Sequence, residues 1–94
     1  MIKSFGDEET RKFWETGPSA RRPPANLRKV APRKLQMLDA AVRLSDLESP
    51  PGNQLHPLGG DRQGQHAIRI NDQFRVCFVW KNGDAYEVEI ADHH

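Results

Sequence analysis

Histidines and arginines that could act together on a phosphate are concentrated in the second half of the chain. Histidine titrates near neutrality, and arginine binds a phosphate through two parallel hydrogen bonds. Metal-free cleavage of RNA needs a base for the 2′-hydroxyl, positive charge on the phosphate and an acid for the leaving 5′-oxygen. The candidates for acid and base work are His56, His93 and His94, and the candidate phosphate ligands are Arg62, Arg69 and Arg75.

Each of these residues also has an interpretation that involves no chemistry. The terminal pair His93-His94 could be a frayed end or the remnant of an affinity tag. His56, next to a proline, could cap an edge strand, and Arg62 could pair with its neighbour Asp61 in a turn. His66 falls among the apolar positions of an alternating segment, so we expect it to be packed rather than catalytic.

Two alternating segments must position the arginines. Residues 65–70 and 74–80 each alternate apolar with polar side chains, which predicts two antiparallel strands that share an apolar face. If residues 71–73 form the loop, the strands pair symmetrically about Asp72. The expected partners are Ile70 with Phe74, Ile68 with Val76 and Arg69 with Arg75.

The last hairpin has two possible registers. A two-residue turn at Asn82-Gly83 would set Phe78 against the charged Glu87. A three-residue loop over residues 82–84 keeps one face apolar, so we predict this second register. Its expected partners are Trp80 with Tyr86, Phe78 with Val88, Val76 with Ile90, Arg75 with Ala91 and Gln73 with His93.

These registers place Arg69, Arg75 and His93 on one polar face. Like charges directly opposite each other across strands cost about 0.2–1 kcal/mol, so their pairing calls for a cause. Binding of an anion is one cause. The alternative is a surface ion-pair network, in which Glu87 or Glu89 neutralises the arginines.

The N-terminal half predicts helices. Residues 1–5 suggest a short strand, and residues 8–16 a helix capped by Asp7. Residues 17–26 form a basic, proline-rich linker in which Arg21 and Arg22 could touch a polyanion. A second helix should cover at least residues 33–43, with Pro32 either kinking it or opening it after an extended Ala31. Residues 55–58 can form only an edge strand because of Pro57.

Length and composition restrict the class of protein. We expect residues 1–94 to form a single domain, and Cys77, the lone cysteine, excludes an internal disulfide. No grouping of cysteine and histidine has the spacing of a metal site, and no cofactor is expected. The chain has no apolar leader or span, so a cytoplasmic location is expected. The net charge of +1 hides a basic block over residues 11–34. This block would attract nucleic acid or an acidic protein, or it is a solvated helix surface.

Several motifs taken together resemble a known family. They are Leu-His-Pro-Leu-Gly-Gly-Asp-Arg-Gln-Gly at residues 55–64, Ile-Arg-Ile-Asn-Asp-Gln-Phe-Arg-Val-Cys-Phe at residues 68–78, and the ending Asp-His-His. Residues 1–5 and 33–41 add to the match. The chain resembles HigB-type toxins of the RelE/ParE superfamily, particularly the HigB/GraT branch, over nearly its whole length.

The resemblance implies an α+β fold in which two N-terminal helices pack on a twisted antiparallel sheet. It also implies a ribosome-dependent endoribonuclease that cleaves mRNA in the 30S A site. A HigA-type helix-turn-helix antitoxin would inhibit it, and the complex would bind operator DNA. The family's catalytic histidines fall on His56 and His94 and its strand arginine on Arg75, with His93 where tyrosine is usual and Gly59 where lysine is frequent. The residues expected to contact RNA are Arg21, Arg22, Arg62, Arg69 and Asn71.

Two other functions remain open at this point. A ParE-like toxin of the same fold would inhibit gyrase without catalysis, and would cause DNA damage rather than cleaved transcripts. A simple nucleic-acid-binding module would need only the basic residues between 21 and 34 and would bind with strong salt dependence.

Overall fold

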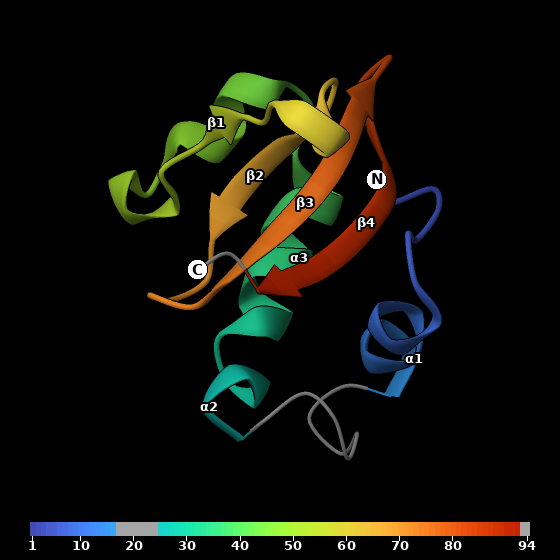
Figure 1. Cartoon of the computed structure of the whole chain (residues 1–94), viewed down its shortest axis with the longest axis vertical. Coiled ribbons are helices and arrows are strands. Elements are labelled where there is room, and N and C mark those ends of the chain that lie inside the picture. Colours follow the sequence, from blue (N-terminus) through green and yellow to red (C-terminus); the bar gives the residue numbers. More distant parts are fainter. Residues whose placement is uncertain (17–24, 93–94) are drawn as a thin grey trace.

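A four-stranded antiparallel sheet with helices packed against it makes up the fold (Figure 1). The computed structural model describes residues 1–16 and 25–92. The strands β1 (His56–Pro57), β2 (His66–Arg69), β3 (Phe74–Lys81) and β4 (Asp84–Asp92) neighbour one another in sequence order. Helix α3 (Ala31–Ala40) lies behind the sheet, and α1 (Glu8–Thr16) contacts β4. The predicted α+β class is confirmed.

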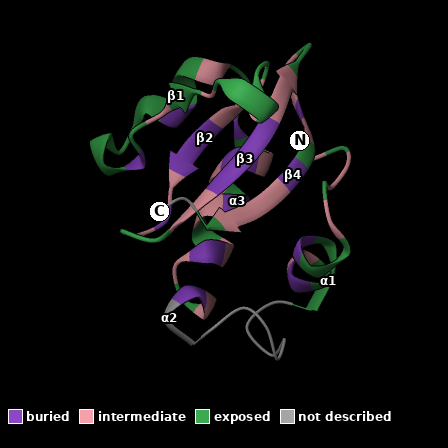
Figure 2. Ribbon diagram, in the orientation of Figure 1, coloured by how far each residue is buried: buried purple, intermediate pink, exposed green. Residues whose placement is uncertain are grey.

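The apolar core lies between α3 and one face of the sheet (Figure 2). Leu35 and Leu38 of α3 are fully buried, as are Ile68, Val76 and Phe78 of the two inner strands. Because side chains alternate across a strand, the residues between these apolar ones lie on the opposite face of the sheet. That opposite face is where the predicted phosphate ligands must lie.

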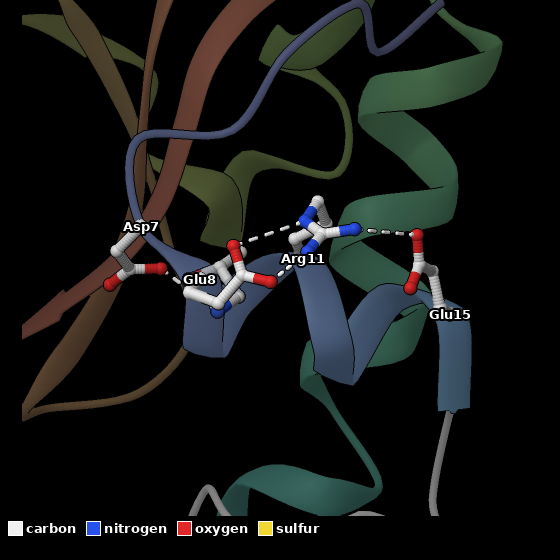
Figure 3. A network of polar contacts seen from close by, with 5 residues as sticks. Asp7, Glu8, Arg11 and Glu15 are labelled. Atoms are coloured by element: carbon white, nitrogen blue, oxygen red, sulfur yellow. Dashed lines mark hydrogen bonds and ion pairs between the residues drawn. The ribbon is translucent and has the colours of Figure 1, made fainter.

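Helix α1 has the bounds that its sequence predicts. The Asp7 carboxylate accepts the backbone N–H of Thr10 at 2.8 Å, which satisfies one of the free donors at the helix start. On the solvent side, Arg11 pairs with Glu8 and, at 3.3 Å, with Glu15 (Figure 3). Part of the basic block is therefore neutralised within its own helix.

The second predicted helix is divided and ends early. A short helix α2 (Ala25–Arg28) precedes α3, which starts at Ala31 with Pro32 in its first turn, so an extended Ala31 was wrong. The helix also stops at Ala40 rather than continuing to Arg43.

The physical reason for this early end is Asp46. Its carboxylate accepts the backbone N–H groups of Val42 and Arg43, each at 3.0 Å, and draws both residues out of the helix. These two hydrogen bonds hold the pKa of Asp46 below its usual value, and the bond from Arg43 has the larger effect.

Residues 1–5 do not form a regular strand. They run parallel to β4 through two isolated bridges, Ile2 with Ala85 and Phe5 with Val88. Backbone bonds from Lys3 N–H to Ala85 O (2.7 Å) and from Gly6 N–H to Val88 O (2.8 Å) hold the segment in place. The predicted first strand is thus present as an edge segment only.

Gly6 allows this close approach, which leads to a prediction of stability. A Cβ on Gly6 would lie 2.9 Å from the carbonyl oxygen of Glu87, whereas one on Gly52 would meet nothing within 4 Å. Gly6→Ala should therefore lower the free energy of unfolding by about 1–3 kcal/mol, because the backbones must separate. Urea unfolding of Gly6→Ala beside Gly52→Ala checks this. Equal midpoints for the two variants would contradict the packing argument.

The β2–β3 hairpin has the predicted register. Ile68 lies opposite Val76 and Arg69 opposite Arg75. The loop begins with Asn71, whose side-chain oxygen accepts the backbone N–H groups of Gln73 (2.9 Å) and Phe74 (2.8 Å). This local hydrogen bonding sets the loop length and so the register.

The β3–β4 register was predicted correctly at one end and wrongly at the other. Val76 lies opposite Ile90 and Arg75 opposite Ala91, as expected. Near the turn, however, Trp80 pairs with Ala85 instead of Tyr86, and Lys81 pairs with Asp84. The hairpin therefore has the two-residue Asn82-Gly83 turn, not the three-residue loop.

A β-bulge reconciles the two ends. The register shifts between Cys77 and Val79, where Glu87 and Val88 together oppose Phe78. Glu87 adopts a positive φ of 53°, which places the extra residue outside the ladder and returns Val88 to the core. The two-residue turn was rejected because it would set Phe78 against Glu87. The bulge places Glu87 outside the regular pairing, so the two-residue turn is compatible with an apolar face.

Candidate functional site

The strand registers gather the candidate residues on one side of the sheet. We call the side opposite the core the polar face. Its first row runs from His56 through Ala67 and Cys77 to Glu89, and its second row is Arg69, Arg75 and Ala91. Ala67 and Cys77 are small and have no exposed surface, so they form a floor between the longer side chains.

His56 reaches this face from the sheet edge. The strand predicted at residues 55–58 is the two-residue β1, paired with β2 at the edge of the sheet. The Nδ1 atom of His56 lies 2.7 Å from the backbone carbonyl oxygen of Gln54. A carbonyl can only accept, so Nδ1 carries the proton and a neutral ring presents Nε2 as a proton acceptor. This arrangement suits a general base.

Gln54 itself has an uncommon backbone conformation. Its φ of 48° lies in the left-handed region, which non-glycine residues seldom occupy. The conformation aims the Gln54 carbonyl back at the imidazole two residues later. The chain thus accepts local backbone strain at the residue that orients His56.

Of the candidate arginines 62, 69 and 75, Arg75 is the one without an ion pair in the described part of the chain. It lies opposite Arg69 on β2 and opposite Ala91 on β4, neither of which is acidic. Over residues 1–16 and 25–92 it forms no ion pair, and its Nε is buried without a hydrogen-bond partner. A buried donor with no partner costs about 1–3 kcal/mol, which an anion on this face would recover.

The other two candidate arginines are paired. Arg69 contacts Asp72, whose side chain is 99% exposed, so this pair contributes little to stability. Arg62 lies 3.1 Å from Glu89 and donates to the Gln65 side chain at 3.1 Å.

Among the described residues, neither Glu87 nor Glu89 forms an ion pair with Arg69 or Arg75. The alternative in which these glutamates neutralise the two arginines is therefore wrong. Glu89 pairs with Arg62, and Glu87 is the exposed residue of the bulge. Arg69 and Arg75 consequently remain opposite each other, and the carboxylate that contacts this pair is the solvent-exposed Asp72, which binds Arg69. This charge imbalance fits a face that receives an anion.

Arg62 also covers the floor of the face. It belongs to the 3-10 helix η4 (Gly60–Arg62), between β1 and β2, but its partner Glu89 is on β4. Its charge is near enough to Cys77 to lower the pKa of that thiol in part. The η4 turn is thereby tied across the sheet rather than being free to move away from it.

Cys77 should be unreactive in the folded protein. Burial, the largest effect, raises the pKa of its thiol above the ordinary value, and Arg62 and Arg75 offset this only partly. The thiolate is the nucleophile, so a buried thiol with a raised pKa reacts slowly. Labelling with a disulfide reagent at pH 7.5 should be slow for the native chain and rapid after guanidinium unfolding. Fast native labelling would contradict this placement of Cys77.

The remaining candidates differ in what can be said of them. Asn71 has committed its side-chain oxygen to the loop, which leaves its amide N–H groups for a ligand. His66 stacks on Phe78 with ring centres 6.3 Å apart, on the core side, as predicted. Arg21, Arg22, His93 and His94 lie outside the described residues.

Two contributions to the face were missed at the level of sequence. Ala67 and Cys77, which make the floor, share the odd-numbered parity of Arg69 and Arg75, and this alternation could have identified them. The pairing of Arg62 with Glu89 had no such signal, because it joins residues 27 apart through the fold.

No described helix is long and apolar enough to cross a membrane.

Comparison with known proteins assigns the family. The model of a family described as the RelE-like toxin of type II toxin-antitoxin system HigB matches residues 3–94. Toxin HigB-1 of Vibrio cholerae is 37% identical over 93 residues, which cover 99% of this chain and 98% of that toxin. Endoribonuclease HigB of Proteus vulgaris is 34% identical over 94 residues, the full length of both.

A solved structure agrees on the fold. A chain of the YoeB-YefM complex from Staphylococcus aureus superposes with a TM-score of 0.62 at 11% identity, covering 100% of this chain and 99% of its own. At this identity the likeness concerns the fold alone. The family match and the full-length relatives go further: the chain belongs to the HigB-like family of RelE-like toxins of type II toxin-antitoxin systems.

Proposed function

We propose that this toxin is a ribosome-dependent endoribonuclease that cleaves mRNA in the A site by metal-independent attack of a 2′-hydroxyl. The observation that carries the proposal is that an oriented imidazole, His56, and Arg75, which has no ion pair among the described residues, lie on the same face of the sheet. The name endoribonuclease borne by the Proteus vulgaris relative supports the same activity.

In this mechanism His56 Nε2 takes the proton of the 2′-hydroxyl as that oxygen attacks the adjacent phosphorus. Arg75 and Arg69 bind the phosphate oxygens as negative charge builds on them. The bond to the 5′-oxygen then breaks, and one of the terminal histidines, His93 or His94, supplies its proton. The products are a 2′,3′-cyclic phosphate and a 5′-hydroxyl, which balances the reaction without water or a metal.

RNA binding would extend beyond the reacting phosphate. Arg62 would have to exchange Glu89 for a phosphate, while the amide of Asn71 could contact a base or the backbone. Arg21 and Arg22 would add charge from the linker. Membership in a toxin-antitoxin family implies an antitoxin partner, which we propose to be a HigA-type helix-turn-helix protein. The ribosome with its mRNA is the second partner that we propose. The antitoxin complex would bind operator DNA.

The decisive experiment compares two mRNAs on programmed ribosomes. Purified toxin should cut an all-ribose message in the A-site codon and leave a 5′-hydroxyl end. A message with a single 2′-deoxynucleotide at the cleaved position should stay intact, because the nucleophile is missing. If neither message is cut while gyrase supercoiling is inhibited, the toxin acts as a ParE-like inhibitor instead.

A further inference from the structure

A glutamate already occupies an arginine of the face that RNA phosphates would contact. The Nη2 atom of Arg62 lies 3.1 Å from Oε1 of Glu89 and 3.4 Å from its Oε2. The other terminal nitrogen, Nη1, donates a hydrogen bond to the side-chain oxygen of Gln65 at 3.1 Å. Both terminal nitrogens of the guanidinium are therefore engaged by side-chain acceptors of the chain itself. A phosphate can bind them only by displacing these acceptors.

The ion pair between Arg62 and Glu89 is partly withdrawn from solvent. The Arg62 side chain is 30% exposed and that of Glu89 is 25% exposed, whereas Asp72, the partner of Arg69, is 99% exposed. Water and salt screen an exposed ion pair more strongly than a partly buried one. A phosphate should therefore displace Asp72 from Arg69 more easily than it displaces Glu89 from Arg62.

Glu89 also lies next to the place proposed for the reacting phosphate. It is opposite Cys77 on β3, and Arg75, two residues before Cys77, is opposite Ala91. Glu89 and Arg75 are thus diagonal neighbours on one face of the sheet, which are about 7–8 Å apart in an antiparallel pair. If Arg62 turns to a phosphate, the carboxylate of Glu89 loses its partner close to a bound anion. Repulsion between the two anions then opposes RNA binding.

Release of Arg62 from Glu89 does not require the core to open. The η4 turn is closed by its own backbone hydrogen bonds, from Arg62 N–H to Gly59 O at 3.1 Å and from Gln65 N–H to Arg62 O at 3.0 Å. On either side of Arg62, a Cβ on Gly60 or Gly64 would meet nothing within 4 Å. The turn is thus not packed against other elements at these two positions, and the Arg62 side chain can change partners while the turn stays folded.

We propose that Glu89 is an internal competitor of the RNA phosphates for Arg62, and that this ion pair lowers the affinity of the toxin for RNA. The inference rests on the proposed function, since it concerns the same RNA-binding face. A carboxylate and a phosphodiester both accept hydrogen bonds from a guanidinium, so each excludes the other at the same nitrogens. Glu89 takes no part in the chemical step. A glutamate that merely positioned Arg62 for RNA would have the opposite effect on affinity.

The direction of the change in affinity on substitution of Glu89 tests the competition. The probe is a fluorescent 2′-O-methyl oligonucleotide, which has no free 2′-hydroxyl, and its binding is followed by fluorescence anisotropy at fixed salt. Glu89→Gln keeps the size of the side chain and removes its charge, so binding should tighten about threefold to tenfold. Equal or weaker binding by folded Glu89→Gln, the result expected of a positioning residue, would overturn the proposal.

Glu87→Gln is the matched control for a general effect of charge. It removes an exposed carboxylate from the same strand and should change binding by less than about twofold. A tightening by Glu87→Gln as large as that by Glu89→Gln would mean that any negative charge on β4 opposes RNA, and the role of Glu89 as a competitor for Arg62 would be rejected.

A double-mutant cycle shows whether the effect passes through Arg62. In the Arg62→Gln background, Glu89→Gln should tighten binding no more than Glu87→Gln does in the unaltered chain. The full tightening in the absence of Arg62 would overturn the competition. If Glu89→Gln does not fold, as judged by thermal unfolding, Glu89→Asp replaces it throughout. Aspartate is one methylene group too short to hold Arg62 as closely, so binding should again tighten, and unchanged binding would count against the proposal.

The two proposals can fail separately. If Glu89→Gln binds the oligonucleotide more tightly but programmed ribosomes yield no cleaved message, the endoribonuclease assignment fails and the competition stands. If the message is cleaved and Glu89→Gln binds no more tightly than the unaltered chain, the competition fails and the endoribonuclease stands. Failure of both the unaltered chain and Glu89→Gln to bind the oligonucleotide would also overturn the competition.

Discussion

Arg75→Ala should lower the single-turnover rate of mRNA cleavage by about 100- to 1,000-fold, the usual loss when one donor to a developing negative charge is removed. The expectation follows from the surroundings of Arg75. Its neighbours across the sheet are Arg69 and Ala91, and its Nε is buried without a partner. No carboxylate of the described residues competes for its charge, so an incoming phosphate would receive its full effect.

Two companion variants make the Arg75 result interpretable. Arg75→Lys keeps the charge but loses the paired geometry, so its rate should lie between those of the unaltered chain and Arg75→Ala. Lys81→Ala removes an exposed cation from the far end of the same strand and should leave the rate unchanged. A quench-flow assay on programmed ribosomes gives the three rates. An Arg75→Ala rate within threefold of the unaltered chain would show that Arg75 does not act on the phosphate.

His56→Asn should reduce the same rate by about 100- to 10,000-fold, the range for loss of a general acid–base group. Asparagine can place its amide N–H near the position of Nδ1 and keep the hydrogen bond to the Gln54 carbonyl. It has no atom at the position of Nε2, so the change removes the proton acceptor while conserving the local fold. The KM for programmed ribosomes should change little, because in the proposed mechanism the arginines, and not His56, bind the phosphate.

His66→Asn is the matched control for His56→Asn. It is the same substitution one strand away, but His66 stacks on Phe78 on the core side. Its effect should appear as a lower midpoint of thermal unfolding, with an unchanged cleavage rate for the folded protein. A larger loss of rate in His66→Asn than in His56→Asn would reverse the assignment of the two histidines.

Local sequence was sufficient for the elements whose hydrogen bonds are local. Asp7 caps α1 through a residue three positions away, and Asn71 closes the β2–β3 loop through residues two and three positions away. The Asp7 cap and an alternating apolar pattern therefore predicted the bounds of α1 and the pairing of Arg69 with Arg75.

The errors occurred where two local signals competed. The apolar period predicted that the second helix continues to Arg43. The helix ends at Ala40 because the Asp46 carboxylate accepts hydrogen bonds from the backbone N–H groups of Val42 and Arg43. In the last hairpin, strict alternation argued against the Asn82-Gly83 turn. The chain keeps that turn and inserts a bulge at Glu87, a residue that the alternation rule did not allow for.

For the site, the sequence by itself determined that Arg69 and Arg75 share the polar face, because strand parity requires nothing beyond the register. Tertiary structure decided which of those charges are available. By sequence alone, Glu89 could have paired with Arg62, Arg69 or Arg75. The position of the η4 turn places Arg62 within ion-pair distance of Glu89. Ion pairs depend on distances of a few ångströms between residues far apart in the chain, and only the folded backbone sets those distances.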